Sequence, residues 1–182
     1  MRKSLLRRKV AGPGRTLPSL RFFGLGTGLA MLAIAATTSC GSAGSLSCSR
    51  SAASAAIART KPTLNVGERV VVTSAQADRV LCFDATGDGR TDLTVSVASG
   101  GSAGDVGWLF FRPRNGRWQL SGSGTGYHLG LFRSNSDIQV VQPVYRAKDP
   151  NCCPTGGFDR ALYRWNGTRL VVARAWHTKN FR

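Results

Sequence analysis

The sequence predicts a mainly β fold: a single antiparallel β domain, either a sandwich or a curved sheet, with little helix. Short runs rich in β-branched and aromatic residues recur throughout residues 61–182. Asn-Gly pairs at 115–116 and 166–167 separate adjacent apolar runs, which is typical of type I′ hairpin turns. No long segment has the apolar spacing of an amphipathic helix. Together these observations indicate an antiparallel sheet protein.

The expected strands follow one another with short connections. They cover residues 69–73, 79–83, 93–97, 108–112, 117–120, 127–132, 138–145, 162–165 and 169–173. Strand periodicity is clearest where Leu93, Val95 and Val97 alternate with smaller residues. Pro143 cannot donate a backbone hydrogen bond, so it predicts an edge strand or a bulge. Residues 51–58 are the stretch most compatible with a short helix.

Composition divides the chain into three parts. Residues 1–39 start with a basic region free of acidic residues and continue in the apolar run 22–36, as in a secretory signal peptide. That run is too short for a comfortable transmembrane helix. Residues 40–60 are rich in Ser and Ala, and we expect a lipid anchor followed by a flexible tether. Residues 61–182 are sufficient for one β domain.

Two cleavage sites compete at the end of the signal. Thr37-Thr38-Ser39-Cys40 resembles a bacterial lipobox, in which the cysteine is acylated, although Thr37 stands where Leu is usual. The alternative is an ordinary signal-peptidase cut after Ala33-Ile34-Ala35. We favour lipidation of Cys40, because two acyl chains and a tether make a stable membrane anchor. The expected location is extracytoplasmic, as a bacterial membrane lipoprotein or a secreted protein.

An acidic, glycine-rich loop lies immediately before the run 93–97. Its spacing directs oxygen atoms from alternate positions inward, as a calcium ion requires. The expected ligands are the side chains of four residues and one backbone carbonyl: Asp84, Thr86, Asp88, the carbonyl of Arg90, and Asp92. Because no base accompanies these carboxylates, we expect a structural calcium ion and not a catalytic one.

This loop resembles the calcium loops of FG-GAP and VCBS repeats, in which a similar Asp- and Gly-containing pattern leads into a strand. The matching residues are Asp84, Gly87, Asp88, Gly89, Asp92 and Leu93. Thr86 departs from the pattern, since the repeats carry Asn or Asp at that position. An EF-hand is excluded because Val95 stands where a bidentate Glu is required. The unit occurs once, so a propeller of such repeats is not expected.

The chain contains five cysteines. If Cys40 is acylated, four remain, an even number suited to disulfides in an oxidising compartment. Four cysteines permit three pairings, and the sequence does not choose among them. We predict that Cys82 is joined to Cys152 or Cys153, with a vicinal bridge between the adjacent pair as an alternative.

The segment 144–157 resembles the corresponding region of actinobacterial lipoproteins of the LppP/LprE type. Its best markers are the turn Cys152-Cys153-Pro154-Thr155-Gly156 and the nearby Trp165-Asn166-Gly167. The resemblance covers about the last 100 residues. It implies a cell-envelope protein whose biochemical role is undefined.

The chain is strongly basic, with a formal net charge of +16. From Gly41 onward, 18 Lys and Arg oppose 9 acidic residues, which leaves +9. This balance favours anionic lipid headgroups, cell-wall polymers or envelope proteins as partners. Because the basic residues do not form runs interleaved with aromatic residues, we do not expect nucleic acid as a partner.

The sequence offers little catalytic machinery. His128 and His177 are its two histidines, and no nucleophile elbow, zinc-protease helix or phosphate-binding loop is present. We therefore expect a non-catalytic binding or scaffold module and not an enzyme.

Two alternatives stay open. One is a small metal-assisted hydrolase in which the acidic loop faces His128. The other is a polymer-binding protein in which four arginines share one exposed face: Arg112, Arg114, Arg117 and Arg133. The four tryptophans are expected mainly in the core, and two of them exposed on one face would indicate a glycan or protein contact.

Overall fold

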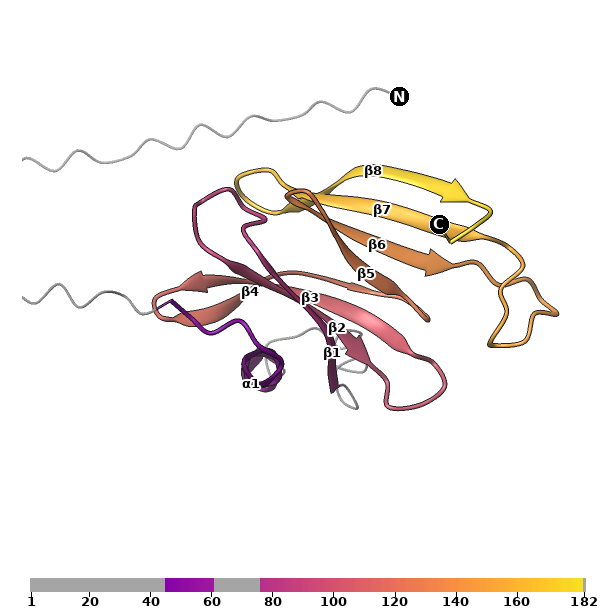
Figure 1. The fold of residues 1–182 in the computed structure, drawn as a ribbon, viewed down its shortest axis with the longest axis horizontal. Helices are drawn as coiled ribbons and strands as arrows, with labels where there is room; N and C mark the ends of the chain where they lie inside the picture. Colours follow the sequence, from indigo (N-terminus) through magenta and orange to yellow (C-terminus); the bar gives the residue numbers. More distant parts are fainter. Residues whose placement is uncertain (1–44, 61–75, 182) are drawn as a thin grey trace, which may run out of the picture. The chain divides into compact units, whose positions relative to one another are not determined.

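The computed structural model describes residues 45–60 and 76–181, which form one helix and eight strands (Figure 1). The elements in chain order are α1 (Arg50–Thr60), β1 (Gln76–Phe83), β2 (Asp92–Ala98), β3 (Asp105–Arg114), β4 (Arg117–Thr125), β5 (Gly130–Ser134), β6 (Asp137–Pro143), β7 (Phe158–Trp165) and β8 (Leu170–Thr178). The signal segment, Cys40 and the predicted strand 69–73 lie outside the described residues.

The strands form two antiparallel sheets, ordered β1-β2-β3-β4 and β5-β6-β7-β8. Within each sheet, every strand pairs with its neighbours in sequence. Phe83, Trp108 and Phe110 from the first sheet share a buried cluster with Leu131 and Ile138 from the second. The prediction of a mainly β, single antiparallel domain is confirmed, and the packing of two sheets makes it a sandwich.

The hairpin predicted at Asn115-Gly116 is confirmed in detail. Arg114 pairs with Arg117, and the two residues between them have positive φ angles of 50° and 70°. At 166–167 the strands also pair, but four residues connect Trp165 to Leu170. The Asn166 side chain accepts hydrogen bonds from the next backbone N–H groups, so this turn is longer than a type I′ turn.

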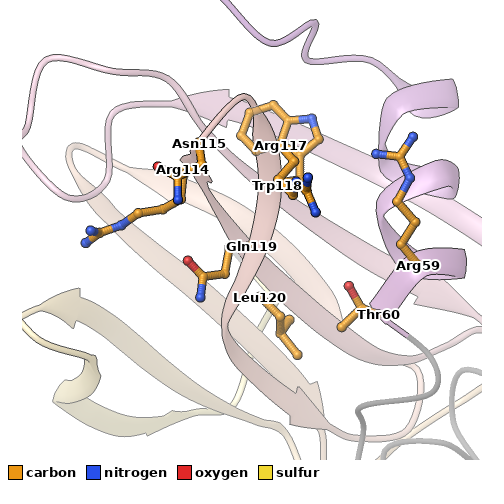
Figure 2. Close-up of a pocket in the computed structure, with 8 residues that line it drawn as sticks. All are labelled: Arg59, Thr60, Arg114, Asn115, Arg117, Trp118, Gln119 and Leu120. Atoms are coloured by element: carbon orange, nitrogen blue, oxygen red, sulfur yellow. The ribbon is translucent and has the colours of Figure 1, made fainter.

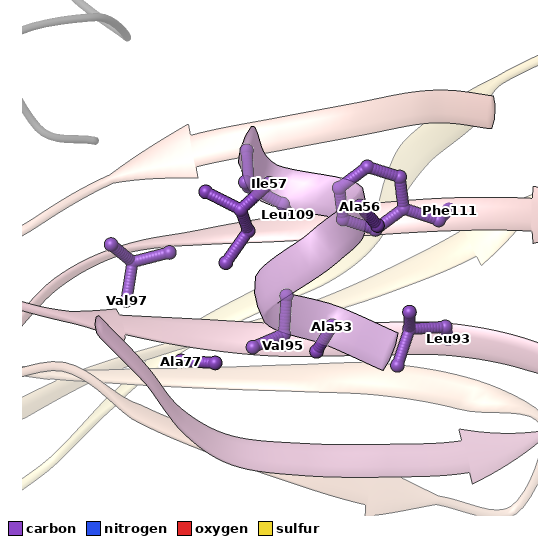
Figure 3. Packing of buried hydrophobic residues seen from close by; sticks show 9 residues of the cluster. All are labelled: Ala53, Ala56, Ile57, Ala77, Leu93, Val95, Val97, Leu109 and Phe111. Atoms are coloured by element: carbon purple, nitrogen blue, oxygen red, sulfur yellow. The ribbon is translucent and has the colours of Figure 1, made fainter. Parts of the chain in front are cut away.

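Helix α1 confirms the short helix expected at residues 51–58 and corrects the prediction of a flexible tether reaching residue 60. The Ser49 hydroxyl accepts a hydrogen bond from the Ala52 N–H at 3.2 Å, as an N-cap does. One face of the helix, formed by Ala53, Ala56 and Ile57, packs on the β1–β4 sheet (Figure 3). It covers the side chains of Leu93, Val95, Val97, Leu109 and Phe111. The small alanine side chains let the helix approach the sheet closely. The Ser- and Ala-rich composition of the segment did not predict this packing.

Strand β3 therefore contributes to two apolar clusters at once. Leu109 and Phe111 face α1, whereas Trp108 and Phe110 face the second sheet. Pro143 does not mark an edge strand, because β6 lies between β5 and β7. It is the last residue of β6, where a missing backbone donor costs little.

Candidate functional site

The acidic loop joins β1 to β2, and its first carboxylate organises the turn. Asp84 Oδ1 accepts hydrogen bonds from the N–H groups of Gly87 and Asp88, and its Oδ2 accepts one from Gly89 at 2.8 Å. Gly87 and Gly89 have positive φ angles of 72° and 79°, which glycine adopts without strain. Asp84 thus directs both oxygens to the backbone of its own loop.

The second carboxylate pairs with arginine. Asp88 Oδ2 lies 3.0 Å from Arg112 Nη2 and 3.2 Å from Arg90 Nη2. Arg90 also donates its backbone N–H to Asp88 Oδ1. Burial alone would raise the pKa of Asp88, but the hydrogen bonds from Arg90 and Arg112 outweigh it and lower the pKa.

The third carboxylate is buried at the start of β2. Asp92 Oδ2 accepts hydrogen bonds from the N–H groups of Ala85 and Thr86, both at 3.0 Å. Its Oδ1 is buried without a hydrogen-bond partner. Burial raises the pKa of Asp92, although hydrogen bonds from Thr86 and Ala85 act in the opposite direction.

The predicted calcium ligands thus lie in one loop, but each carboxylate already has protein partners. Among residues 45–60 and 76–181, no three His, Cys, Asp or Glu side chains are grouped to hold a metal ion. The positive charges that meet Asp88 belong to Arg90 within the loop and to Arg112 on β3. Sequence spacing did not identify Arg112 as part of this site, because Arg112 follows Asp88 by 24 residues.

The predicted disulfide is wrong: Cys82 pairs with Cys48 and not with the adjacent cysteines. Their Cα atoms are 5.9 Å apart, and the bridge spans 34 residues. Cys152 pairs with Cys153, which was the alternative. The Cys48–Cys82 pairing follows from the docking of α1, which brings the segment before the helix beside β1.

The turn that contains Cys152 and Cys153 is held by Asp149. Its carboxylate accepts hydrogen bonds from the N–H groups of Arg146 and Thr155, at 2.8 and 2.7 Å, and from the Thr155 hydroxyl. The backbone hydrogen bonds from Arg146 and Thr155 lower the pKa of Asp149.

His128 does not face the acidic loop. Leu129, next to it, donates its N–H to the carbonyl of Asp105 at the start of β3. The acidic loop instead meets the other end of the sheet, where Leu93 pairs with Phe111. Six residues of strand separate these positions, which corresponds to about 20 Å. The hydrolase alternative therefore lacks the arrangement it requires.

A basic groove of about 720 Å³ lies between α1 and β4, and we call it the α1–β4 groove. Arg59 on the helix points toward Trp118 and Arg117 on β4, while the Arg114 guanidinium points away from the helix (Figure 2). The groove is lined by Arg59, Thr60, Arg114, Asn115, Arg117, Trp118, Gln119 and Leu120. It combines arginines, amides and one aromatic ring.

The predicted face of four arginines is only partly formed. Arg114 and Arg117 flank the β3–β4 turn and are exposed. Arg112, by contrast, is buried, and its guanidinium lies 4.4 Å from the Trp165 ring centroid. Arg133 is on the second sheet, over the ring of Phe83. Arg59 takes part instead, and the sequence missed it because it was assigned to the tether.

Comparisons with protein families, curated proteins and solved structures found no match to this chain. Within residues 45–60 and 76–181, no helix is both long and apolar enough to span a membrane.

Proposed function

We propose that this protein is an exported, lipid-anchored module of the cell envelope that binds anionic envelope polymers without catalysing a reaction. The observation that carries this proposal is the α1–β4 groove, where arginines from α1, β3 and β4 border a common surface. Export is supported by the basic and apolar N-terminal segment. The Cys48–Cys82 bridge suits an oxidising compartment.

The charges of the groove favour an anionic ligand. Among the described residues, Arg59, Arg114 and Arg117 form no ion pair with a carboxylate, so their charges are available to a partner. Guanidinium groups bind phosphate and carboxylate through paired hydrogen bonds. Asn115 and Gln119 add neutral donors and acceptors beside them.

The groove suits an extended polymer better than a small molecule. It is open to solvent, and its arginines lie on both sides of the β3–β4 hairpin (Figure 2). A chain with regularly spaced negative charges can contact all three arginines, whereas one small anion cannot. These arginines are solvent-exposed, so each ion pair with a polymer contributes about 0.2–1 kcal/mol to the binding free energy. High affinity therefore requires several arginines to bind the same polymer.

The test uses inorganic polyphosphate, a polyanion without sugar groups, as the binding probe. We expect the doubly substituted Arg59→Gln/Arg117→Gln protein to bind about tenfold more weakly at low ionic strength, because two exposed charges are lost. Binding by the unsubstituted protein should also weaken as salt is added. Isothermal titration calorimetry measures both effects.

Arg169→Gln is the matched control. Arg169 is exposed and lies in the turn between β7 and β8, on the other sheet. Like the single substitution Arg117→Gln, it removes one positive charge, but outside the groove, and it should leave most of the affinity intact. An equal loss in both proteins would show a diffuse effect of net charge and would contradict the proposed groove.

A structural calcium ion at the acidic loop is a second proposal, supported by one observation. Asp92 Oδ1 is buried without a partner at the base of the loop, and a cation would satisfy it. The competing contacts are the ion pairs of Asp88 with Arg112 and Arg90. Calcium binding in this loop therefore requires Asp88 to exchange a guanidinium for the ion.

The calcium proposal predicts a change in thermal stability. Adding calcium to protein treated with a chelator should raise the melting temperature, because the ion binds the folded loop. The Asp88→Ala protein should show no rise. Calorimetry measures the melting temperature with calcium and with chelator. If the two values are equal, the loop does not bind calcium and Asp88 stays paired with Arg112.

A further inference from the structure

A second hollow, of about 450 Å³, lies between the two sheets on the side where β4 faces β7 and β8, and we call it the inter-sheet cleft. Trp108 and Tyr163 form its aromatic floor, with ring centroids 4.8 Å apart. Thr125, Gln142 and Asp159 also line it. Its volume is within the range of about 300–1,000 Å³ that is typical of small-molecule sites.

Small residues keep this cleft open. Ala161 on β7 pairs with Ala175 on β8, so two neighbouring positions of the floor carry only methyl groups. Gly124 pairs with Trp108, and a Cβ atom at Gly124 would lie 2.5 Å from the indole nitrogen. The glycine therefore lets the indole lie across β4 at the wall of the cleft. A larger residue at Ala161 or Ala175 would occupy this space.

The cleft is lined by neutral hydrogen-bonding groups that form no side-chain hydrogen bond with the described residues. Trp108 is only 2% exposed, yet its indole N–H donates to none of the described residues. The same holds for the side-chain hydroxyls of Tyr163 and Thr125 and for the amide of Gln142. Thr125 and Gln142 are exposed, and the Trp108 nitrogen is not one of the buried polar atoms without a partner, so these groups can meet a ligand in the cleft.

The charged groups near the cleft are already engaged. Asp159 Oδ1 lies 2.9 Å from His177 Nδ1. Arg160 donates from Nε to the Thr178 hydroxyl, and its Nη2 donates to the carbonyl of Phe181. The groups left for a ligand are therefore hydroxyl, amide and indole groups around aromatic rings.

We propose that the inter-sheet cleft binds one neutral sugar ring. A pyranose presents hydroxyls that both donate and accept, which matches Gln142, Thr125 and Tyr163. Its apolar C–H face matches the aromatic floor, and one hydroxyl oxygen accepts from the Trp108 indole. This inference goes beyond the proposed polyanion function, because it concerns a different surface and an uncharged ligand.

The experiment follows the indole N–H resonance of Trp108 by two-dimensional NMR of the purified chain. Neutral methyl glycosides of glucose, mannose, galactose and N-acetylglucosamine are added up to about 10 mM, which detects dissociation constants near 1 mM. At least one glycoside should shift the Trp108 indole resonance in a saturable manner. Inorganic polyphosphate should leave this resonance unchanged.

Two substitutions locate the binding. Gln142→Ala removes a rim amide and should weaken binding about three- to tenfold, the effect of one neutral hydrogen bond. Ala161→Leu fills the floor and should abolish it. Gln119→Ala, which removes the same side chain from the α1–β4 groove, is the matched control and should bind the glycoside normally.

Two results would overturn the inference. One is the absence of any Trp108 shift with all four glycosides. The other is a shift that persists unchanged in both Gln142→Ala and Ala161→Leu, because the sugar would then bind elsewhere. Polyphosphate binding by these two proteins should be normal, so failure of the sugar site and failure of the proposed polyanion function are distinguishable.

Discussion

At the scale of single residues, Arg112 connects the acidic loop to the second sheet. Its guanidinium contacts Asp88 at 3.0 Å and lies over the ring of Trp165 on β7. Trp108, Phe110 and Arg112 are alternate residues of β3 and face the second sheet. Because alternate side chains of β3 point toward the second sheet, Arg112 is buried, although the sequence predicted it on an exposed basic face.

We expect Arg112→Gln to lower the free energy of unfolding by about 2 kcal/mol. Breaking a fully buried ion pair costs about 3–5 kcal/mol, and the cost is smaller here because solvent reaches part of Asp88. Loss of the stacking on Trp165 adds to the effect. Urea unfolding followed by tryptophan fluorescence measures the change.

Arg90→Gln is the matched control, because Arg90 pairs with the same oxygen of Asp88. Its side chain is 53% exposed, compared with 9% for Arg112. We expect a loss below about 0.5 kcal/mol. If both proteins were destabilised equally, the buried position of Arg112 would have no special role.

At the scale of elements, α1 shows how a Ser- and Ala-rich segment becomes part of a core. Isolated helices of this length are marginal in water, so packing supplies most of the stability. Ala53, Ala56 and Ile57 provide that packing, and all three are 5% exposed or less. The helix also carries Arg59 to the α1–β4 groove. The groove therefore depends on the docking of α1.

A pair of substitutions tests this docking. Ala56→Asp places a charge against the apolar sheet and should destabilise the protein by about 3 kcal/mol or detach the helix. Ala55→Asp makes the same change at an exposed position and should have little effect. Urea unfolding gives the stabilities, and amide hydrogen exchange reports whether α1 stays docked.

Polyphosphate binding is the second measurement on this pair. Detachment of the helix in Ala56→Asp removes Arg59 from the groove and should weaken binding. Hydrogen exchange shows whether the helix is detached in this protein. If it is detached and polyphosphate binding is still normal, Arg59 does not contribute to polyphosphate binding.

At the scale of the whole molecule, the Cys48–Cys82 bridge ties the segment before α1 to the first strand. A loop of 34 residues is closed by this bridge. The chain-entropy model assigns such a loop about 4 kcal/mol of stabilisation. The bridge between Cys152 and Cys153 joins neighbouring residues and closes no comparable loop.

We therefore expect the Cys48→Ala/Cys82→Ala protein to lose about 2–4 kcal/mol of unfolding free energy. The matched control, Cys152→Ala/Cys153→Ala, should lose less than about 1 kcal/mol, because its unfolded chain gains little freedom. Thermal unfolding by calorimetry compares the two. A larger loss in the control would contradict this ranking.

The sequence by itself determined the local structure. Strand alternation, the Asn115-Gly116 turn and the absence of long amphipathic helices predicted an antiparallel β domain, because these signals depend on neighbouring residues. The acidic spacing also identified the loop between β1 and β2, and the structure shows that its carboxylates accept backbone hydrogen bonds from their own loop. The contact of this loop with Arg112, which lies 24 residues after Asp88, could not be predicted from local spacing.

Only the tertiary structure decided which distant residues meet. The pairing of Cys82 with Cys48, the contact of Arg112 with Asp88 and the docking of α1 all join segments separated by many residues. Their partners depend on which strands are adjacent and which face each residue presents. Local pattern specifies neither, because burial and pairing result from the packing of the whole domain.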